Sequence, residues 1–172
     1  MSDPRVLVMM GSDSDLPVMA EAAKVLTKLE IGHEVVVTSA HRTPERTAEI
    51  IKRAPERGVK VFIAGAGAAA HLAGVVAAHT TLPVLGVPLA ASDLNGLDAL
   101  LATAQMPAGI AVGTLAIGKA GAANAAWLAA SILSTSDEGL AERLADERRK
   151  MAEKVVAKSE AAQTKLGELL SS

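Results

Sequence analysis

The chain has 172 residues, a length typical of one globular domain, and no cysteine, which excludes disulfides and thiolate metal sites. Lysine and arginine total 17 and aspartate and glutamate total 19, so the formal net charge is −2. That balance excludes a generally basic nucleic-acid binder. Phe62 and Trp127 are the only aromatic residues, so the platforms on which single-stranded nucleic acids stack are absent too.

Charge is distributed unevenly along the chain. Between Val61 and Ser136 the only charged residues are Asp93, Asp98 and Lys119. A membrane span needs about 20 strongly apolar residues, and the apolar segments here are rich in Ala and Gly and broken by His, Lys or Asn. We therefore expect no membrane insertion but a compact homo-oligomer, whose subunits cover these charge-poor helices through large, dry interfaces.

The first 15 residues, MSDPRVLVMMGSDSD, differ from a signal peptide. They lack a basic leader, and their apolar run is too short for the central segment of such a peptide. The sequence therefore predicts a cytoplasmic location.

Short apolar runs typical of buried strands alternate with stretches of helical periodicity. In chain order we expect a strand over Arg5–Met10, a helix over Pro17–Glu30, a strand over Glu34–Thr38, a helix from the N-cap Thr43 and Pro44 to about Ala54, a strand over Val59–Ala64, a helix over Ala69–His79, a strand over Pro83–Val87, a helix over Leu97–Gln105, a strand over Ile110–Ala116, a buried helix over Ala120–Leu133 and a charged helix over Glu138–Leu170. This alternation predicts one α/β domain over residues 1–172, with a parallel sheet, right-handed crossovers and helices on both faces.

We expect the site residues in the loops that follow the strands, because ligands of open parallel sheets bind at the carboxyl ends of the strands, near the switch in strand order. With the strand order 2-1-3-4-5, the loops after the first three strands converge. The first of these, Gly11–Asp15, offers two hydroxyls, two carboxylates and backbone N–H groups. The carboxylates suit ribose hydroxyls. The alternative is that Ser14 or Asp15 simply caps the next helix, but this explains one of the four polar residues in the loop and not all four.

The second loop contains Ser39, Ala40, His41 and Arg42. Arg42 can form a bidentate pair with a phosphate or carboxylate. His41 titrates near neutrality and can both accept and donate a proton. The alternative is an ordinary solvent-exposed loop histidine.

The third loop, Gly65–His71, is only partly like a dinucleotide-binding loop. The full G-x-G-x-x-G pattern fails because residue 70 is Ala, and no acidic residue follows the next strand, so NAD binding is disfavoured. Small residues still let a ligand approach the backbone. For His71, a ligand role and a structural or capping role remain open. No His, Asp and Glu cluster has metal-ligand spacing.

Four segments together resemble the PurE family, the N5-carboxyaminoimidazole ribonucleotide mutases of purine biosynthesis. They are MGSDSDLPVM, SAHRTP, GAGAAAHLAGVVAAHTTLPVLGVP and GLDALLATAQMPAGIAVGTLAIGKAGAANAAWLAASIL. The resemblance covers roughly residues 5–135. It implies a three-layer αβα fold with a flavodoxin-like parallel sheet and a C-terminal helix, a homo-octamer, and a ribonucleotide substrate. It also implies that no metal, biotin or nucleotide cofactor is used.

The resemblance also implies roles for single residues. His41 matches the catalytic histidine of the family. The residues that match substrate-binding positions are Ser12 and Asp15 in the first loop, Ser39 and Arg42 at the phosphate, and Gly67, Ala68 and His71 in the segment around the aminoimidazole and carboxylate. The family usually has Gly at position 68 and Pro at position 73, where this chain has Ala. The extra Cβ of Ala68 is expected to shift its loop slightly.

The implied reaction moves a carboxylate from an exocyclic nitrogen to ring carbon 4. A carbamate loses CO2 once its nitrogen is protonated, and the new C–C bond leaves a proton on carbon 4 that must be removed. His41 can serve both steps, with CO2 as an intermediate held beside the ring. The alternatives are a related carboxylase that uses free CO2, a non-catalytic nucleotide- or flavin-binding module, and a structural scaffold.

Overall fold

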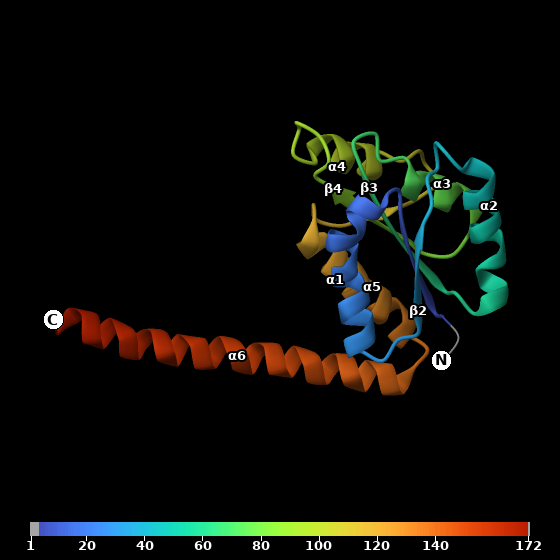
Figure 1. Ribbon diagram of the computed structural model, residues 1–172. Helices are drawn as coiled ribbons and strands as arrows, with labels where there is room; N and C mark the ends of the chain where they lie inside the picture. The colour runs from blue at the N-terminus through green and yellow to red at the C-terminus, as the bar shows by residue number, and fades with distance from the viewer. Residues whose placement is uncertain (1–3, 172) are drawn as a thin grey trace. The chain divides into compact units, whose positions relative to one another are not determined.

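The computed structural model describes residues 4–171 and contains a five-stranded parallel sheet (Figure 1). Its strands are β1 (Val6–Met10), β2 (His33–Val37), β3 (Val61–Gly67), β4 (Val84–Leu89) and β5 (Gly113–Thr114). They are ordered β2-β1-β3-β4-β5, and every pairing is parallel. The predicted order is confirmed, and the switch in strand order lies between β1 and β3.

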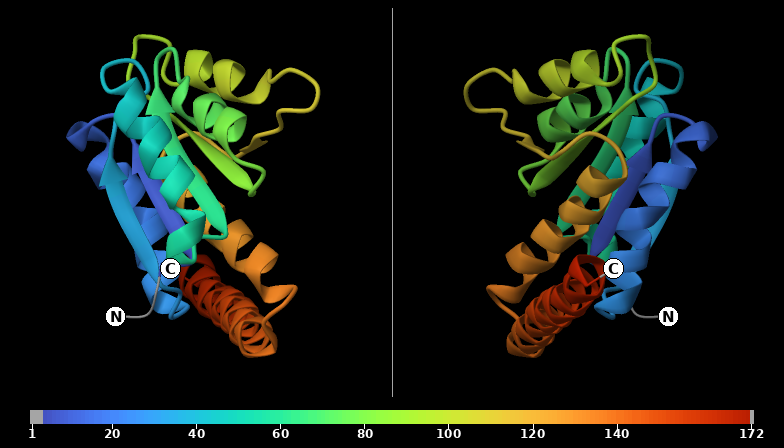
Figure 2. Two further views of the ribbon diagram at one scale, coloured as in Figure 1. Left: turned by 90° about the vertical axis from the view of Figure 1, so that its right-hand side faces the viewer. Right: turned by 90° about the vertical axis from the view of Figure 1, so that its left-hand side faces the viewer.

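Helices cover both faces of this sheet. They are α1 (Leu16–Lys28), α2 (Pro44–Arg53), α3 (Leu72–His79), α4 (Leu97–Ala104) and α5 (Lys119–Ser134). Helices α1 and α5 lie on one face, and α2, α3 and α4 lie on the other (Figure 2). The predicted three-layer αβα fold is confirmed.

The core follows from the apolar runs. All five residues of β1 are buried, as expected of a strand covered on both faces. On the α2 and α3 side, Ile51 and Val76 pack with Met9 and Phe62 in one cluster. This packing fixes the ends of β1 and β3, from which two of the candidate site loops emerge.

Strands β3, β4 and β5 and helix α5 differ from the prediction. Only Gly113–Thr114 of the expected strand Ile110–Ala116 pairs with β4, whereas β3 and β4 continue through Gly67 and Leu89. Helix α5 buries one side and leaves Leu128 exposed, so the prediction that it is buried all round is wrong.

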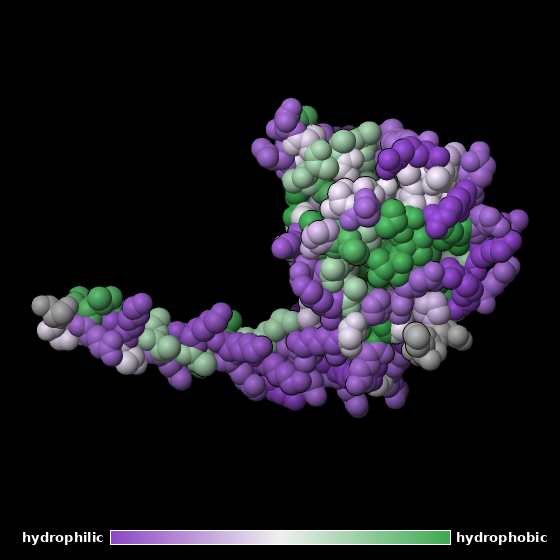
Figure 3. Space-filling view, viewed as in Figure 1, coloured by the Kyte–Doolittle hydropathy of each residue, from purple (hydrophilic) through white to green (hydrophobic). Residues whose placement is uncertain are grey.

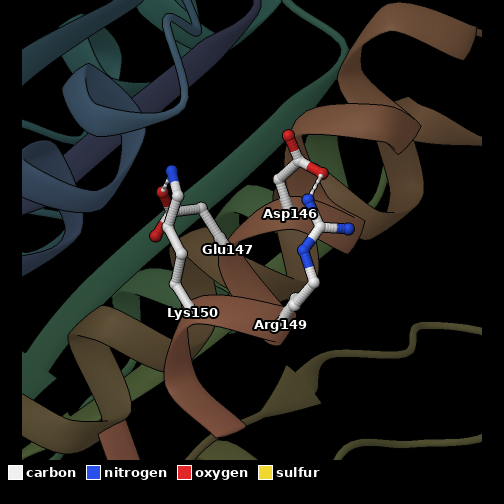
Figure 4. A network of polar contacts seen from close by, with 4 residues as sticks. All are labelled: Asp146, Glu147, Arg149 and Lys150. Carbon is white, nitrogen blue, oxygen red and sulfur yellow. Dashed lines mark hydrogen bonds and ion pairs between the residues drawn. The ribbon is translucent and has the colours of Figure 1, made fainter. Parts of the chain in front are cut away.

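The chain divides into two compact units, Met1–Leu133 and Ser134–Ser172, and the second consists of helix α6 (Glu138–Leu170). The carboxylate of Asp137 caps this helix by accepting the N–H of Leu140 at 3.0 Å. Two ion pairs spaced by three residues follow, Asp146–Arg149 and Glu147–Lys150 (Figure 4). That residues 1–172 form a single domain stays a prediction.

Helix α6 buries Leu140 and Leu144 in its N-terminal part. Met151 and Val155 are exposed. Within residues 4–171, no helix is long and apolar enough to cross a bilayer.

Candidate active site

The loops that follow β1 to β4 meet around one cavity of about 350 Å³. This position is at the carboxyl edge of the sheet and beside the switch in strand order. All eight predicted site residues line the cavity: Ser12, Asp15, Ser39, His41, Arg42, Gly67, Ala68 and His71. The structure therefore brings the whole predicted set together, and their chemical roles stay predictions.

The first loop is shaped by a reciprocal cap on the short 3-10 helix Asp13–Asp15. The Ser12 hydroxyl accepts the N–H of Ser14 at 3.3 Å, and the Asp15 carboxylate accepts the N–H of Ser12 at 3.0 Å. Ser12, with its extended backbone, is the N-cap of this 3-10 helix, whereas Asp15 occupies the N-cap position of α1 without a side-chain cap hydrogen bond. Burial raises the pKa of Asp15, although the N–H groups of Ser12 and Gly11 oppose this.

Hydrogen bonds within the second loop orient the Arg42 side chain toward the first loop. The Ser39 hydroxyl accepts the backbone N–H of Arg42 at 3.1 Å and its Nε at 3.5 Å. Nη2 of Arg42 donates to the carbonyl oxygen of Gly11 at 3.2 Å. A guanidinium carries five N–H donors, so donors remain for an anion in the cavity.

The histidines of the second and third loops form a pair. Nε2 of His41 and Nδ1 of His71 are 2.7 Å apart, and the rings meet edge to face at an interplanar angle of 82°. At this distance one of the two nitrogens must carry a proton, because two bare lone pairs would repel each other. The contact joins residues 30 positions apart and favours a role for His71 in the site over a capping role. His71 makes no side-chain cap on α3.

The third loop brings the backbone close to the cavity. Gly67 touches the segment after β4, since a Cβ on it would lie 2.4 Å from the Cβ of Ala91. Ala68 and Ala70 have φ angles of 51° and 45°, in the left-handed region that favours glycine. Ala73 lies in the buried face of α3, where it packs in the core.

Ala91 reaches the cavity from the fourth loop and was not among the predicted site residues. The strand predicted over Pro83–Val87 extends further in the structure, because Pro88 and Leu89 also pair with β3. The signal available was the continued apolar run through Leu89. A larger hollow of about 820 Å³ lies at the opposite edge of the sheet, where His79 is the one titratable side chain in its lining.

No group of three or more His, Asp or Glu side chains in the described part of the chain is arranged to hold a metal ion. The candidate residues instead offer an imidazole pair, a guanidinium, a carboxylate and hydroxyls. Such a set can bind a phosphorylated sugar and exchange a proton with a bound ring.

Comparison with known proteins identifies the family. A family model described as AIR carboxylase matches residues 5–154. The chain belongs to this family, the PurE family. The N5-carboxyaminoimidazole ribonucleotide mutase of Vibrio parahaemolyticus is 54% identical over 153 residues, which cover 89% of this chain and 95% of the relative. The mutase of Bacillus subtilis is 53% identical over 156 residues, covering 91% and 96%.

Solved structures agree with this family assignment. The crystal structure of Treponema denticola PurE matches with a TM-score of 0.83 and 26% identity, and the match covers 91% of this chain and 97% of that one. With relatives above 50% identity over most of its length, this PurE-family chain is an enzyme of the isomerase class, a mutase.

Proposed function

We propose that this chain converts N5-carboxyaminoimidazole ribonucleotide to 4-carboxy-5-aminoimidazole ribonucleotide in purine biosynthesis. The names of its relatives support the substrate and product. The cavity supports the chemistry, because it combines groups for an anion and a sugar with groups that move protons.

The phosphate and the ribose of the substrate are assigned to the first two loops. Arg42 and Ser39 hold the phosphate, since a guanidinium and a hydroxyl both donate to phosphate oxygens. Ser12 and Asp15 bind the ribose, whose hydroxyls donate to the carboxylate. The small residues Gly67 and Ala68 let the aminoimidazole lie against the backbone of the third loop.

The proposed reaction needs one proton in and one proton out. His41 donates a proton to the exocyclic nitrogen, whose bond to the carboxyl carbon breaks and releases CO2. Ring carbon 4 then attacks CO2 through the electron pair of the ring, and His41 removes the hydrogen from carbon 4 as a proton. Protons balance over the cycle, so no cofactor is required.

His71 is assigned as the partner of His41. The 2.7 Å contact lets one proton be shared between the rings. Before the first proton transfer and after the second the pair can share this proton, and the contact orients the His41 ring. This contact beside Arg42 is the observation that carries the proposal.

The direct test is to supply the purified protein with N5-carboxyaminoimidazole ribonucleotide and follow formation of the carbon-4 carboxylate. We expect turnover without added bicarbonate. Absence of turnover with this substrate would reject the assignment.

The second candidate is carboxylation of 5-aminoimidazole ribonucleotide by free CO2, which the description of the matching family model favours. In that case aminoimidazole ribonucleotide would be the preferred substrate, and the rate would depend on bicarbonate. Offering each substrate separately, with and without bicarbonate, distinguishes the two.

We also propose that the enzyme is a homo-octamer. Leu94, Leu97 and Leu101 are 61%, 53% and 49% exposed at α4, and Val35 and Val37 are exposed on β2, where the space-filling view shows an apolar patch (Figure 3). Subunit contacts would cover such surfaces. Light scattering should give about eight times the 17.5 kDa mass of one chain. A cytoplasmic location stays a prediction.

A further inference from the structure

The second loop is held by a threonine in an unexpected orientation. Thr43 occupies the N-cap position of α2, but its side chain makes no hydrogen bond to the helix. Instead its hydroxyl donates to the carbonyl oxygen of Ser39 at 3.0 Å and accepts the Ser39 N–H at 3.1 Å. The Thr43 N–H adds a third hydrogen bond between the two residues, to the Ser39 carbonyl at 2.8 Å. Thr43 therefore closes the loop onto its first residue rather than capping the helix.

Two buried threonines, Thr38 after β2 and Thr47 in α2, support Thr43. Thr38 directly follows β2 and donates its N–H to the carbonyl oxygen of Met10 at 2.8 Å. Its hydroxyl lies 2.8 Å from that of Thr47 in α2, and Thr47 donates to the carbonyl oxygen of Thr43 at 2.9 Å. Thr38 and Thr47 are both buried, so the network rests on the sheet and not on the surface.

Counting protons assigns a direction to each hydrogen bond. A hydroxyl has one proton to donate. The proton of Thr47 goes to the Thr43 carbonyl, so Thr38 donates to Thr47. The proton of Thr43 goes to the Ser39 carbonyl, which leaves the 3.3 Å contact between Thr38 and Thr43 without a donor. The Thr43 hydroxyl thus acts on Ser39, the Thr47 hydroxyl acts on the backbone of Thr43, and the Thr38 hydroxyl acts on Thr47.

The loop segment closed by the hydrogen bonds between Ser39 and Thr43 contains the residues of the proposed chemistry. Between Ser39 and Thr43 lie His41, which meets His71 at 2.7 Å, and Arg42, which reaches the Gly11 carbonyl at 3.2 Å. Both side chains are exposed, so packing does little to hold them. Their positions depend on the backbone of the loop, and a displacement of about 1 Å can cost a hundredfold in rate.

We propose that Thr43 is a positioning residue of the mutase reaction, whose hydroxyl holds the loop so that His41 meets His71 and Arg42 faces the cavity. This rests on the proposed function. A purely structural role would make Thr43 matter for stability alone. A positioning role makes it matter for the loop and for turnover.

The test compares three variants. Thr43→Val keeps the β-branched shape and removes the hydroxyl, and it removes no helix cap because none is made. Thr43→Ser restores the hydroxyl. Thr103→Val is the matched control, since Thr103 is a buried helical threonine whose hydroxyl donates to the Ala99 carbonyl at 2.7 Å, away from the cavity.

We expect kcat/KM of Thr43→Val to fall about tenfold or more, with a lower kcat and a higher KM because both His41 and Arg42 are displaced. Hydrogen exchange of the Ser39 amide should speed up in this variant, while Thr43→Ser should restore most of both properties. Thr103→Val should keep the kinetics of the unchanged protein even where its melting temperature falls.

Two results would overturn the inference. One is unchanged kinetics in Thr43→Val together with unchanged exchange at Ser39. The other is equal loss of activity in Thr43→Val and Thr103→Val, which would mean a general effect on folding. If the unchanged protein lacks mutase activity, the proposed function fails. Hydrogen exchange of the Ser39 amide in Thr43→Val then decides whether the Thr43 hydroxyl holds the loop.

Discussion

Ala68 is the residue at which a small change gives the sharpest test of the third loop. Its φ of 51° lies in the left-handed region, where an L-residue with a Cβ is strained by about 1–2 kcal/mol. Ala68→Gly removes this strain but gives the unfolded chain more freedom, which costs about 0.4–1 kcal/mol. We expect a net gain of about 0.8 kcal/mol in the free energy of unfolding.

The neighbouring residue provides the control. Ala69 is exposed like Ala68, but its φ is not in the left-handed region. Ala69→Gly therefore relieves no strain and pays only the entropy of the unfolded chain, so it should lose about 0.7 kcal/mol. The two variants should differ by about 1.5 kcal/mol and in sign.

The assay is denaturant unfolding at one fixed protomer concentration, because association would shift the apparent stability. Thermal melting provides a second measurement. If Ala68→Gly is destabilised as much as Ala69→Gly, the backbone at position 68 is not strained, and the described conformation of this loop is wrong.

The remaining predictions concern the polar residues of the cavity. His41→Asn should lower kcat by about 10²-fold or more while substrate still binds, and near-normal turnover would reject the proton-transfer role. Arg42→Ala should weaken substrate binding by roughly tenfold to a hundredfold, whereas Arg53→Ala, which removes an exposed arginine paired with Glu49, should not. Because burial raises the pKa of Asp15, the folded state keeps a proton that the unfolded state has lost, and this carboxyl opposes folding increasingly as pH rises from about 4 through the raised pKa. Stability of Asp15→Asn relative to the unchanged protein should therefore increase over that range in pH-dependent unfolding, and a constant difference would contradict the burial argument.

The sheet could be predicted because its signals are local. Apolar runs such as Arg5–Met10 have to be buried on both faces, and their alternation with helices leaves few topologies. The short β5 could not be read in the same way. Ile110–Ala116 is apolar enough for a strand, but pairing needs a neighbour, and only Gly113–Thr114 lies opposite β4. Gly67 shows the opposite error for the same reason. The sequence predicts it in the loop after the third strand, but it pairs with Leu89 of β4 and so lies in the sheet.

The membership of the site was predictable, but its internal contacts were not. The rule that loops converge at the carboxyl edge was enough to group Ser12, His41 and His71. It could not show that the two imidazoles meet, because that depends on the exact path of two loops 30 residues apart. For Thr43, the sequence predicted the cap position correctly and the direction of the hydroxyl wrongly. Several acceptors compete for one hydroxyl, and the tertiary fold selects among them.

The two names attached to this family, carboxylase and mutase, become compatible once the proposed reaction is divided into its bond changes. Formation of the bond between ring carbon 4 and CO2, followed by loss of the ring proton, is common to both. They differ in where the CO2 comes from, the carbamate or the solvent. The third loop contributes small apolar side chains to the wall, among them Ala66, Ala68 and Ala70, and these side chains offer no polar group to bind bicarbonate. Such walls favour keeping a neutral CO2 beside the ring over admitting it from water. In the proposed reaction, the choice between the two activities thus lies in how well this cavity retains CO2, while the histidine pair performs the same proton transfers in either case.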